Sequence, residues 1–381
     1  MSTRTSKRAK AIHPSLIREI RAHARPTSLD LGLGQSDLLV CEPARRAIAE
    51  AARRGHAPYG PNLGDAPMRE AVAARYGIHS SEVMITSGVQ EALAVALLGL
   101  VDAGDEVLVP DPGFPAYPNL VRAAGATPVP YTLEADQGWA LNMEALEDAI
   151  GPSTRAIVLN APGNPTGTVL GAEELDTLLG LLARRGIIWV SDEIYEDYVY
   201  TGQHVSPASH PEHGLGGVRL SGLSKSHHMM GWRLGWLTGP TALVEELKPL
   251  HQHLVTSAST LIQAGGAVAL EHHDEVVSST MEVFRTRRQI AHELGAKLPG
   301  ITFAESQGAF YMFLNAAAHM ERFGDSLGLC RAILDDVDVI TVPGSGFGPA
   351  GEGHVRVAYT VDDDTLRDAF ERLRAFFEQA S

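Results

Sequence analysis

The chain has 381 residues, with 31 Lys and Arg against 46 Asp and Glu, so its formal net charge is −15. A chain longer than about 300 residues usually splits into more than one hydrophobic core, and we therefore expect two domains. The negative charge argues against a nucleic-acid partner, because like charges repel the phosphate backbone.

The two cysteines, Cys41 and Cys330, are too few for a disulfide framework or a four-cysteine zinc site. The basic N-terminus is not followed by the apolar stretch of a signal peptide. The longest apolar run, residues 92–101, has about half of the ~20 residues that a membrane helix needs. These features predict a cytoplasmic protein that makes no membrane contact.

Helix and strand patterns alternate from residue 43 to residue 191. We expect helices over 43–54, 65–76 and 90–101, and strands over 82–86, 106–110, 154–160 and 187–191. Apolar strands separated by helices are typical of a mostly parallel sheet that is covered on both faces. The predicted fold class is therefore α/β.

From about residue 285 the predicted strands are short, over 301–303, 311–313, 339–342 and 355–358, with helices between and after them. This change of pattern predicts a smaller α+β domain that also includes the N-terminal arm. We divide the chain into the arm with part of the small domain (1–44), a large domain (45–284) and the small C-terminal domain (285–381).

Small or polar residues follow four of the predicted strands, at 86–88, 111–113, 160–167 and 191–193. Ligands bind to open α/β sheets at the carboxyl ends of the strands. We therefore expect the four clusters to line one cleft.

Lys225 is the only lysine between Lys10 and Lys248, and it lies among small residues just after a predicted strand. Most lysines are solvated surface residues. Small neighbours, however, let a ligand approach the backbone and let the amine be desolvated, which favours its nucleophilic form.

Four further features fit either a structural or a binding role. Asp192 ends a buried strand, where a carboxylate needs a cation or a protonated ring nitrogen, although it could also cap the next turn. Arg233 fits a core ion pair or a phosphate clamp, and the loop 160–167 fits a plain turn or a rigid holder for Asn164. Gly88 opens an apolar helix, whose first N–H groups favour phosphate.

Together these clusters resemble the class I and II aminotransferases, which are pyridoxal phosphate enzymes of fold type I. The resemblance extends from residues 31–34 to residues 355–358, and its most specific motifs are 164–167, 192–195 and 224–233. It implies an aminotransferase that moves the α-amino group of an L-amino acid to a 2-oxo acid by a ping-pong mechanism. It also implies a homodimer with sites at the subunit interface.

The resemblance implies a role for each residue that matches a family motif. Lys225 would bond covalently to the aldehyde of pyridoxal 5'-phosphate and carry the proton that moves during the reaction. Asp192 would pair with the pyridine nitrogen, while Tyr195 and Asn164 would hydrogen-bond the ring 3-oxygen. Phe114 would stack on the ring, although plain core burial is the alternative.

The same resemblance implies holders for the phosphate and the substrate. The residues around the phosphate would be Gly88, Val89, Gln90, Ser224 and Arg233. Tyr59 would reach the phosphate of the neighbouring subunit. Arg356 would clamp the substrate carboxylate beside Gly34 and Asn164, although an arginine on a strand also fits a surface cross-strand pair.

Two positions depart from the family pattern. Gly222 stands where many members have a serine, which removes one phosphate contact. Gln90 stands where some aspartate-specific members carry a lysine. The sequence therefore does not predict a strict preference for aspartate, and neutral and aromatic amino acids remain alternatives.

Other functions remain open from the sequence. A fold-type-I enzyme could instead be a β-eliminating lyase or an amino-acid oxidase, because these residues only labilise a bond to Cα. The motif G-x-G-x-x-G at 346–351 contains Pro349 and precedes a strand, so we expect a turn and not a dinucleotide loop. The histidines at 227–228, 251–253 and 272–273 lack metal-site spacing, and we expect solvated helix faces and no metal.

Overall fold

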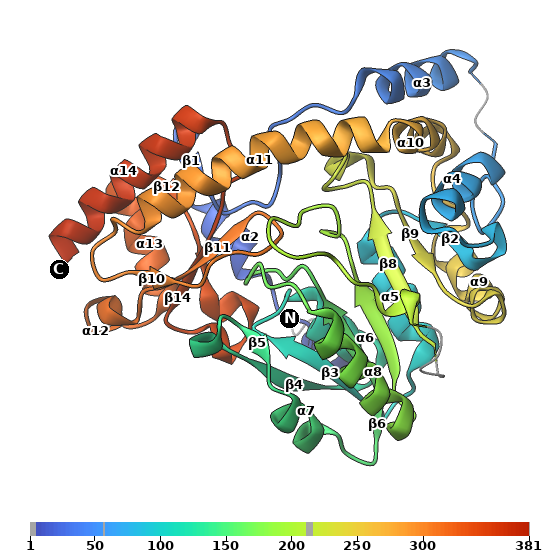
Figure 1. Cartoon of the computed structure of the whole chain (residues 1–381), viewed down its shortest axis with the longest axis horizontal. Helices are drawn as coiled ribbons and strands as arrows, with labels where there is room; N and C mark the ends of the chain where they lie inside the picture. The colour runs from blue at the N-terminus through green and yellow to red at the C-terminus, as the bar shows by residue number, and fades with distance from the viewer. Residues whose placement is uncertain (1–4, 56–57, 211–215, 381) are drawn as a thin grey trace.

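The computed structural model describes residues 5–55, 58–210 and 216–380 of the chain. A large sheet lies beside a smaller C-terminal part, and the long helix α11 (His273–Gly295) runs from one to the other (Figure 1). This arrangement confirms the predicted α/β class with a mostly parallel central sheet.

The central sheet contains eight strands among the described residues. In spatial order they are β2 (Val83–Thr86), β9 (Gly235–Thr238), β8 (Val218–Gly222), β7 (Ile188–Asp192), β6 (Thr154–Asn160), β3 (Glu106–Asp111), β4 (Thr127–Glu134) and β5 (Ala140–Leu141). Neighbours from β8 to β4 pair in parallel, whereas β9 is antiparallel to both β2 and β8, and β5 is antiparallel to β4. The parallel strands bring their carboxyl ends to one edge of the sheet.

Helices cover both faces of this sheet. One face packs on α5 (Val89–Leu100), α6 (Ala116–Ala124) and α9 (Thr241–Val255), and the other on α7 (Met143–Ala149) and α8 (Ala172–Arg185). Because successive strand residues point to opposite faces, Val107 and Val109 belong to the first cluster and Leu108 to the second. Burial on both faces explains why these strands are almost wholly apolar.

A third layer closes the end of the sheet that carries β2. It consists of α3 (Glu42–Arg53), α4 (Ala66–Tyr76) and α10 (Thr260–Glu271). Gly265 and Gly266 of α10 permit the close packing, since an added Cβ would lie 2.4 Å from Ile48 and 2.2 Å from Leu234, respectively.

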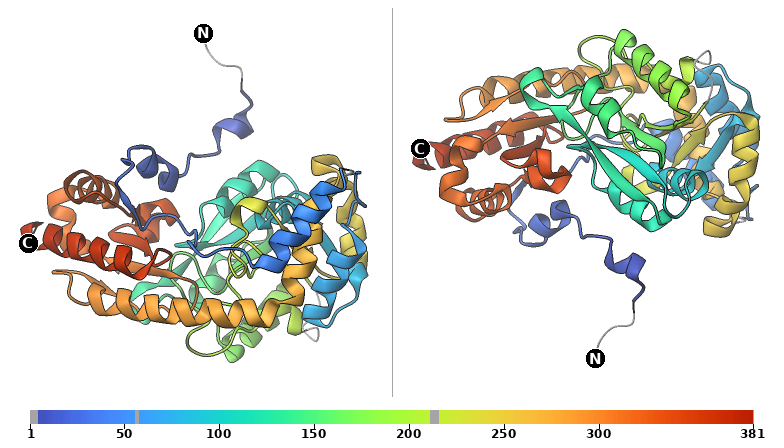
Figure 2. Two further views of the ribbon diagram at one scale, coloured as in Figure 1. Left: turned by 90° about the horizontal axis from the view of Figure 1, so that it is seen from above. Right: turned by 90° about the horizontal axis from the view of Figure 1, so that it is seen from below.

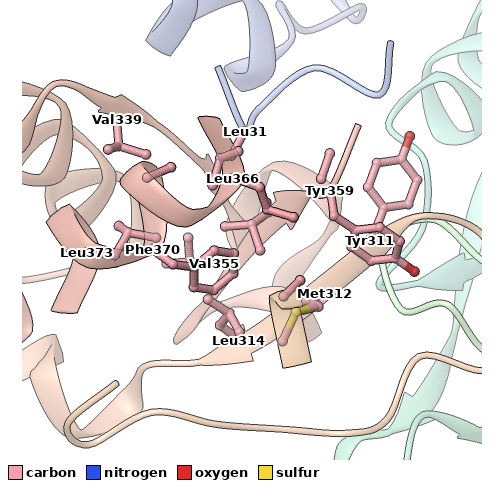
Figure 3. Packing of buried hydrophobic residues seen from close by; sticks show 14 of the residues in the cluster. Leu31, Tyr311, Met312, Leu314, Val339, Val355, Tyr359, Leu366, Phe370 and Leu373 are labelled. Atoms are coloured by element: carbon pink, nitrogen blue, oxygen red, sulfur yellow. The ribbon is translucent and has the colours of Figure 1, made fainter. Parts of the chain in front are cut away.

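The smaller part combines a four-stranded sheet with helices. The strands are β10 (Thr302–Phe303), β11 (Tyr311–Asn315), β14 (His354–Ala358) and β13 (Val342–Pro343), and the helices are α12 (Met320–Phe323), α13 (Ser326–Val337) and α14 (Asp363–Ala380). Its buried apolar cluster is shown in Figure 3, where Tyr311 lies on the side away from Val339 and Leu373. The segment 344–351 forms two short 3-10 helices, which confirms the predicted turn.

The N-terminal segment joins this smaller part. It contains α1 (Lys7–Lys10), α2 (Leu16–Ala22) and β1 (Leu29–Asp30), and β1 pairs in parallel with β12 (Val339–Ile340). Figure 2 shows α1 standing out from the body of the molecule. The predicted domain boundaries after residues 44 and 284 lie within α3 and α11, so each helix extends from one predicted unit into the next.

None of the helices in the described part of the chain is both long and apolar enough to cross a membrane.

Candidate active site

A cavity of about 580 Å³ opens where the carboxyl ends of the parallel strands meet the smaller part. Residues that follow β2, β3, β6, β7 and β8 all line it. Of the predicted site residues, those that line the cavity are Gly34, Val89, Gln90, Phe114, Asn164, Asp192, Tyr195, Ser224, Lys225, Arg233 and Arg356. The prediction that all four clusters line one cleft is wrong for 86–88 and 111–113, whose residues are not part of the cavity lining. Asp111, from the second cluster, instead accepts a hydrogen bond from the amide of Ala350 at 3.0 Å.

Lys225 lies in the loop that follows β8, with its amine inside the cavity. Its Nζ donates to the carbonyl oxygen of Gly34 at 2.6 Å and lies 5.7 Å from the centre of the Tyr195 ring. Burial lowers the pKa of Lys225 to about 8, and the charge of Arg356 acts in the same direction, while Asp192 opposes them. The lowered pKa makes the unprotonated amine, which a nucleophile or a base requires, easier to reach near neutral pH than in an ordinary lysine.

Asp192 is the last residue of β7 and is almost completely buried. Its Oδ2 accepts from the hydroxyl of Tyr117 at 2.9 Å, and its Oδ1 accepts from the amide of Ile194 at 3.2 Å. Burial raises the pKa of the Asp192 carboxyl to about 6, although both hydrogen bonds act to lower it. A cationic partner in the cavity would favour the ionised form.

Arg356 lies on β14, the strand that pairs with both β11 and β13, and only 2% of its surface is exposed. Its Nη1 donates to Oδ1 of Asn164 at 2.8 Å, and its Nη2 donates to the carbonyl oxygen of Gly32. Its guanidinium also lies 4.3 Å from the centre of the Tyr311 ring. The alternative of a surface cross-strand pair is therefore wrong, because β14 is a central strand.

The first turn of α5 forms another wall of the cavity. Gly88 caps this helix with a φ of 87°, and a Cβ added there would lie 2.6 Å from Nη2 of Arg233. Ser224 lies beside Lys225 and is buried, and Arg233 donates from Nη1 to the carbonyl oxygen of Met230 at 3.0 Å. Helix N–H groups, a hydroxyl and a guanidinium are together suited to an anion.

Tyr59 is the predicted site residue that stands apart from the cavity. It lies between α3 and α4 with 89% of its surface exposed. The Tyr59 side chain is therefore not part of the cavity wall described here.

Comparison with known proteins agrees with this geometry. A family model described as aminotransferase class I and II matches residues 26–373. The aspartate aminotransferase of Geobacillus stearothermophilus is 33% identical, with 98% of each chain covered, and the aromatic-amino-acid aminotransferase 2 of Thermococcus litoralis is 30% identical with the same coverage. A solved alanine aminotransferase from Pyrococcus furiosus superimposes with a TM-score of 0.92 at 29% identity, over 99% of this chain and 100% of the other.

The chain belongs to the class I and II aminotransferase family. The predicted family and enzyme class are thereby confirmed, and a β-eliminating lyase or an oxidase is not favoured. The relatives are named after different amino acids, so the names leave the amino donor of this aminotransferase open.

Two tyrosines of this aminotransferase site were missed from the sequence. Tyr117, on α6, donates to Asp192, and the hydroxyl of Tyr311 lies 2.8 Å from that of Tyr195. Tyr311 also limits the space at Gly34, where an added Cβ would lie 2.0 Å from its hydroxyl oxygen. Neither tyrosine belongs to a motif, and only the fold brings them to the cavity.

The histidine prediction is wrong for three residues, because His227, His228 and His251 are buried. His227 stacks on His273 with ring centres 5.2 Å apart, and Nε2 of His228 lies 3.0 Å from the Thr280 hydroxyl. His227 and His228 contact residues of α11, and His251, on α9, lies against α5. The sequence pattern could not indicate these contacts.

A group of metal-ligand type does lie behind the sheet edge. Atoms of Glu193, Glu196 and His204 lie within 4.8 Å of one another. They already have partners: the Ser206 hydroxyl donates to Glu193 at 2.7 Å, and that of Ser221 donates to Glu196 at 2.6 Å. We therefore describe this group as a buried ion-pair network.

The raised pKa of Asp192 predicts how the stability of the ligand-free protein depends on pH. The folded protein holds the Asp192 proton more tightly than the unfolded chain does, so the free energy of unfolding falls as the pH rises from about 4 to about 6. The difference between 3.8 and about 6 corresponds to about 3 kcal/mol. We expect Asp192→Asn to raise the free energy of unfolding by up to this amount at pH 8 and by little at pH 4.

Denaturant unfolding of the ligand-free protein at both pH values measures this effect. The exposed Asp102 provides the control, since Asp102→Asn removes a carboxylate from the surface and not from the interior. A stabilisation by Asp192→Asn that was equal at both pH values would contradict the assignment.

Proposed function

We propose that this protein is a pyridoxal phosphate-dependent aminotransferase that transfers the α-amino group of an L-amino acid to a 2-oxo acid in two half-reactions. The observation that carries the proposal is the buried amine of Lys225, with a lowered pKa, in a cavity that also contains Asp192 and Arg356. A buried base between an acid and a guanidinium is suited to a zwitterionic substrate.

The cavity offers a complementary group for each end of the cofactor. The first turn of α5 with Ser224 and Arg233 suits the phosphate, and the buried carboxyl of Asp192 suits a protonated ring nitrogen. Phe114 lines the same cavity and supplies an apolar face for the ring. The residues present therefore fit pyridoxal 5'-phosphate.

When bound, pyridoxal phosphate supplies an electron-withdrawing ring that stabilises negative charge on the substrate Cα. Nζ of Lys225 would take the proton from Cα of the donor amino acid in the first half-reaction and would deliver a proton to Cα of the new amino acid in the second. The two Nη groups of Arg356 hold the substrate carboxylate, and Asn164 fixes the guanidinium by its hydrogen bond at 2.8 Å. Tyr117 and the Ile194 amide keep the carboxyl of Asp192 in place.

An absorption experiment tests the function directly. The purified protein should be yellow, or become yellow when pyridoxal phosphate is added. An L-amino acid donor should remove the visible band, and a 2-oxo acid should restore it without net release of ammonia. A protein that stays colourless with added cofactor would overturn the proposal, and release of ammonia with pyruvate would indicate a lyase.

A panel of donors with the same readout defines the substrate. The neutral amide of Gln90 and the apolar side chains of Leu33 and Leu93 in the cavity wall favour neutral donors, whereas Arg18 adds a cation suited to a second carboxylate. Leucine, phenylalanine and aspartate therefore form the informative comparison.

As a further proposal, the two free cysteines fit a cytoplasmic location.

We also propose a homodimer in which Tyr59 contributes to the partner's phosphate site. Tyr59→Phe should weaken pyridoxal phosphate binding about tenfold, the cost of one hydrogen bond to a charged group. The exposed side chain should contribute little to the stability of its own chain.

Mixed dimers test this arrangement. In a dimer of one Tyr59→Phe chain and one Lys225→Ala chain, one site retains both native residues and should bind the cofactor with native affinity. Weakened binding at that site would place Tyr59 in its own subunit's site instead.

A further inference from the structure

A buried histidine–glutamate pair lies behind the turn that we assign to the cofactor phosphate. Nε2 of His251, on α9, lies 3.1 Å from Oε1 of Glu91, in the first turn of α5. The His251 side chain is completely buried, and only 10% of the Glu91 side chain reaches solvent. The site described above uses neither residue.

Glu91 fixes the turn through its second oxygen. Oε2 accepts a hydrogen bond from the backbone N–H of Ser87, the residue before Gly88. The turn has little freedom on its other sides, because an added Cβ at Gly88 would lie 2.6 Å from Nη2 of Arg233 and one at Gly235 would lie 2.8 Å from the amide of Val89. The carboxylate of Glu91 therefore helps to set where the first N–H groups of α5 point.

This use of a carboxylate has an electrostatic cost. The helix N-terminus favours a negative side chain, but a second anion at the same helix end repels the first in a medium of low dielectric constant. Glu91 would thus oppose the phosphate that the turn is to bind. The imidazole of His251, whose Nε2 lies 3.1 Å from Oε1, sets its polar edge against this charge, although the contact does not have the geometry of a hydrogen bond.

We propose that His251 is a positioning residue for the cofactor phosphate: it offsets the charge of Glu91 and so lets Glu91 hold the turn at 87–89 without repelling the phosphate. This inference rests on the proposed function, because it needs a phosphate at that turn. An ordinary packing contact between α5 and α9 would affect only the stability of the fold. A positioning role for His251 would affect cofactor binding as well.

The experiment compares five forms of the cofactor-free protein: the wild type, His251→Gln, Glu91→Gln, the double variant and His253→Gln. His253 lies two residues from His251 on the same helix but is exposed, and therefore provides the matched control. Each form is titrated with pyridoxal phosphate to obtain Kd, and the ³¹P chemical shift of the bound cofactor is recorded. The thermal midpoint of each cofactor-free form separates binding from stability.

We expect His251→Gln to raise Kd about tenfold and to move the ³¹P shift, with His253→Gln unchanged. Glu91→Gln keeps an oxygen acceptor for Ser87 but removes the charge, so it should bind at least as tightly as the wild type. In that background His251→Gln should have no further effect on Kd, which a double-mutant cycle reveals as non-additivity.

An unchanged Kd for His251→Gln, with or without a lower thermal midpoint, would overturn the inference, and so would equal losses in both backgrounds. If His251→Gln does not fold, His251→Asn replaces it in the same cycle. A wild-type protein that takes up no pyridoxal phosphate would refute the proposed function itself, whereas uptake with equal Kd in all five forms would refute only the role of His251.

Discussion

Lys225→Ala should reduce turnover by roughly 10²–10⁴-fold from the lost proton transfer alone, and further because no covalent attachment can form. The amine is the one basic nitrogen in the cavity whose pKa is lowered to about 8, so neighbouring arginines cannot replace it as a base. Steady-state assays with a donor and a 2-oxo acid measure the loss. Borohydride reduction followed by mass spectrometry should label the wild type at Lys225 and leave the variant unlabelled.

Lys248→Ala is the matched control for this prediction. Lys248 is partly exposed and pairs with Glu245 at 2.9 Å on α9, away from the cavity lining, so its removal should leave turnover unchanged. Far-ultraviolet circular dichroism of both variants should match the wild type. Turnover of Lys225→Ala within threefold of the wild type would remove the assigned role.

Arg356→Ala should reduce kcat/KM by about 3 kcal/mol or more, which is a hundredfold or more, because a buried charge partner of the substrate carboxylate is lost. Arg356→Lys should recover only part of this loss, since an ammonium keeps the charge but cannot form the two parallel hydrogen bonds. Amines without a carboxylate should react equally slowly with all three forms. That comparison separates substrate binding from damage to the catalytic groups.

Arg374→Lys provides the control for Arg356→Lys. Arg374 pairs with Glu378 on the exposed side of α14, and the substitution should change neither kcat nor KM. If Arg356→Ala lowered kcat/KM equally for amino acids and for amines without a carboxylate, Arg356 would be a structural residue and not a substrate clamp.

The sequence predicted that Asp192 and Lys225 lie at one edge of the sheet, because their positions follow from the topology of parallel strands. Asp192 and Lys225 each end or follow an apolar strand, and strands of that kind must place such residues at one edge. Tyr117 could not be predicted, because its contact with Asp192 joins residues 75 positions apart and follows from how α6 crosses the sheet.

The local sequence pattern also could not predict which of these side chains are buried. Arg356 and a surface arginine on a strand look alike in sequence, and the difference arises from the neighbours that β14 acquires on both sides. His251 is buried while His253 is exposed, because α9 turns only one of them toward α5. Tertiary packing, which no short window contains, decides both cases.

The hydrogen bond from Lys225 to the Gly34 carbonyl also connects the amine that we assign as the base to the cavity wall. This hydrogen bond joins the loop after β8 to the N-terminal segment. Gly34 in turn lies close to Tyr311, since an added Cβ would lie 2.0 Å from its hydroxyl oxygen. A covalent bond at this nitrogen would leave it fewer protons to donate to the Gly34 carbonyl. The same nitrogen that we assign as the base would thus also contribute to holding the segment beside Arg356.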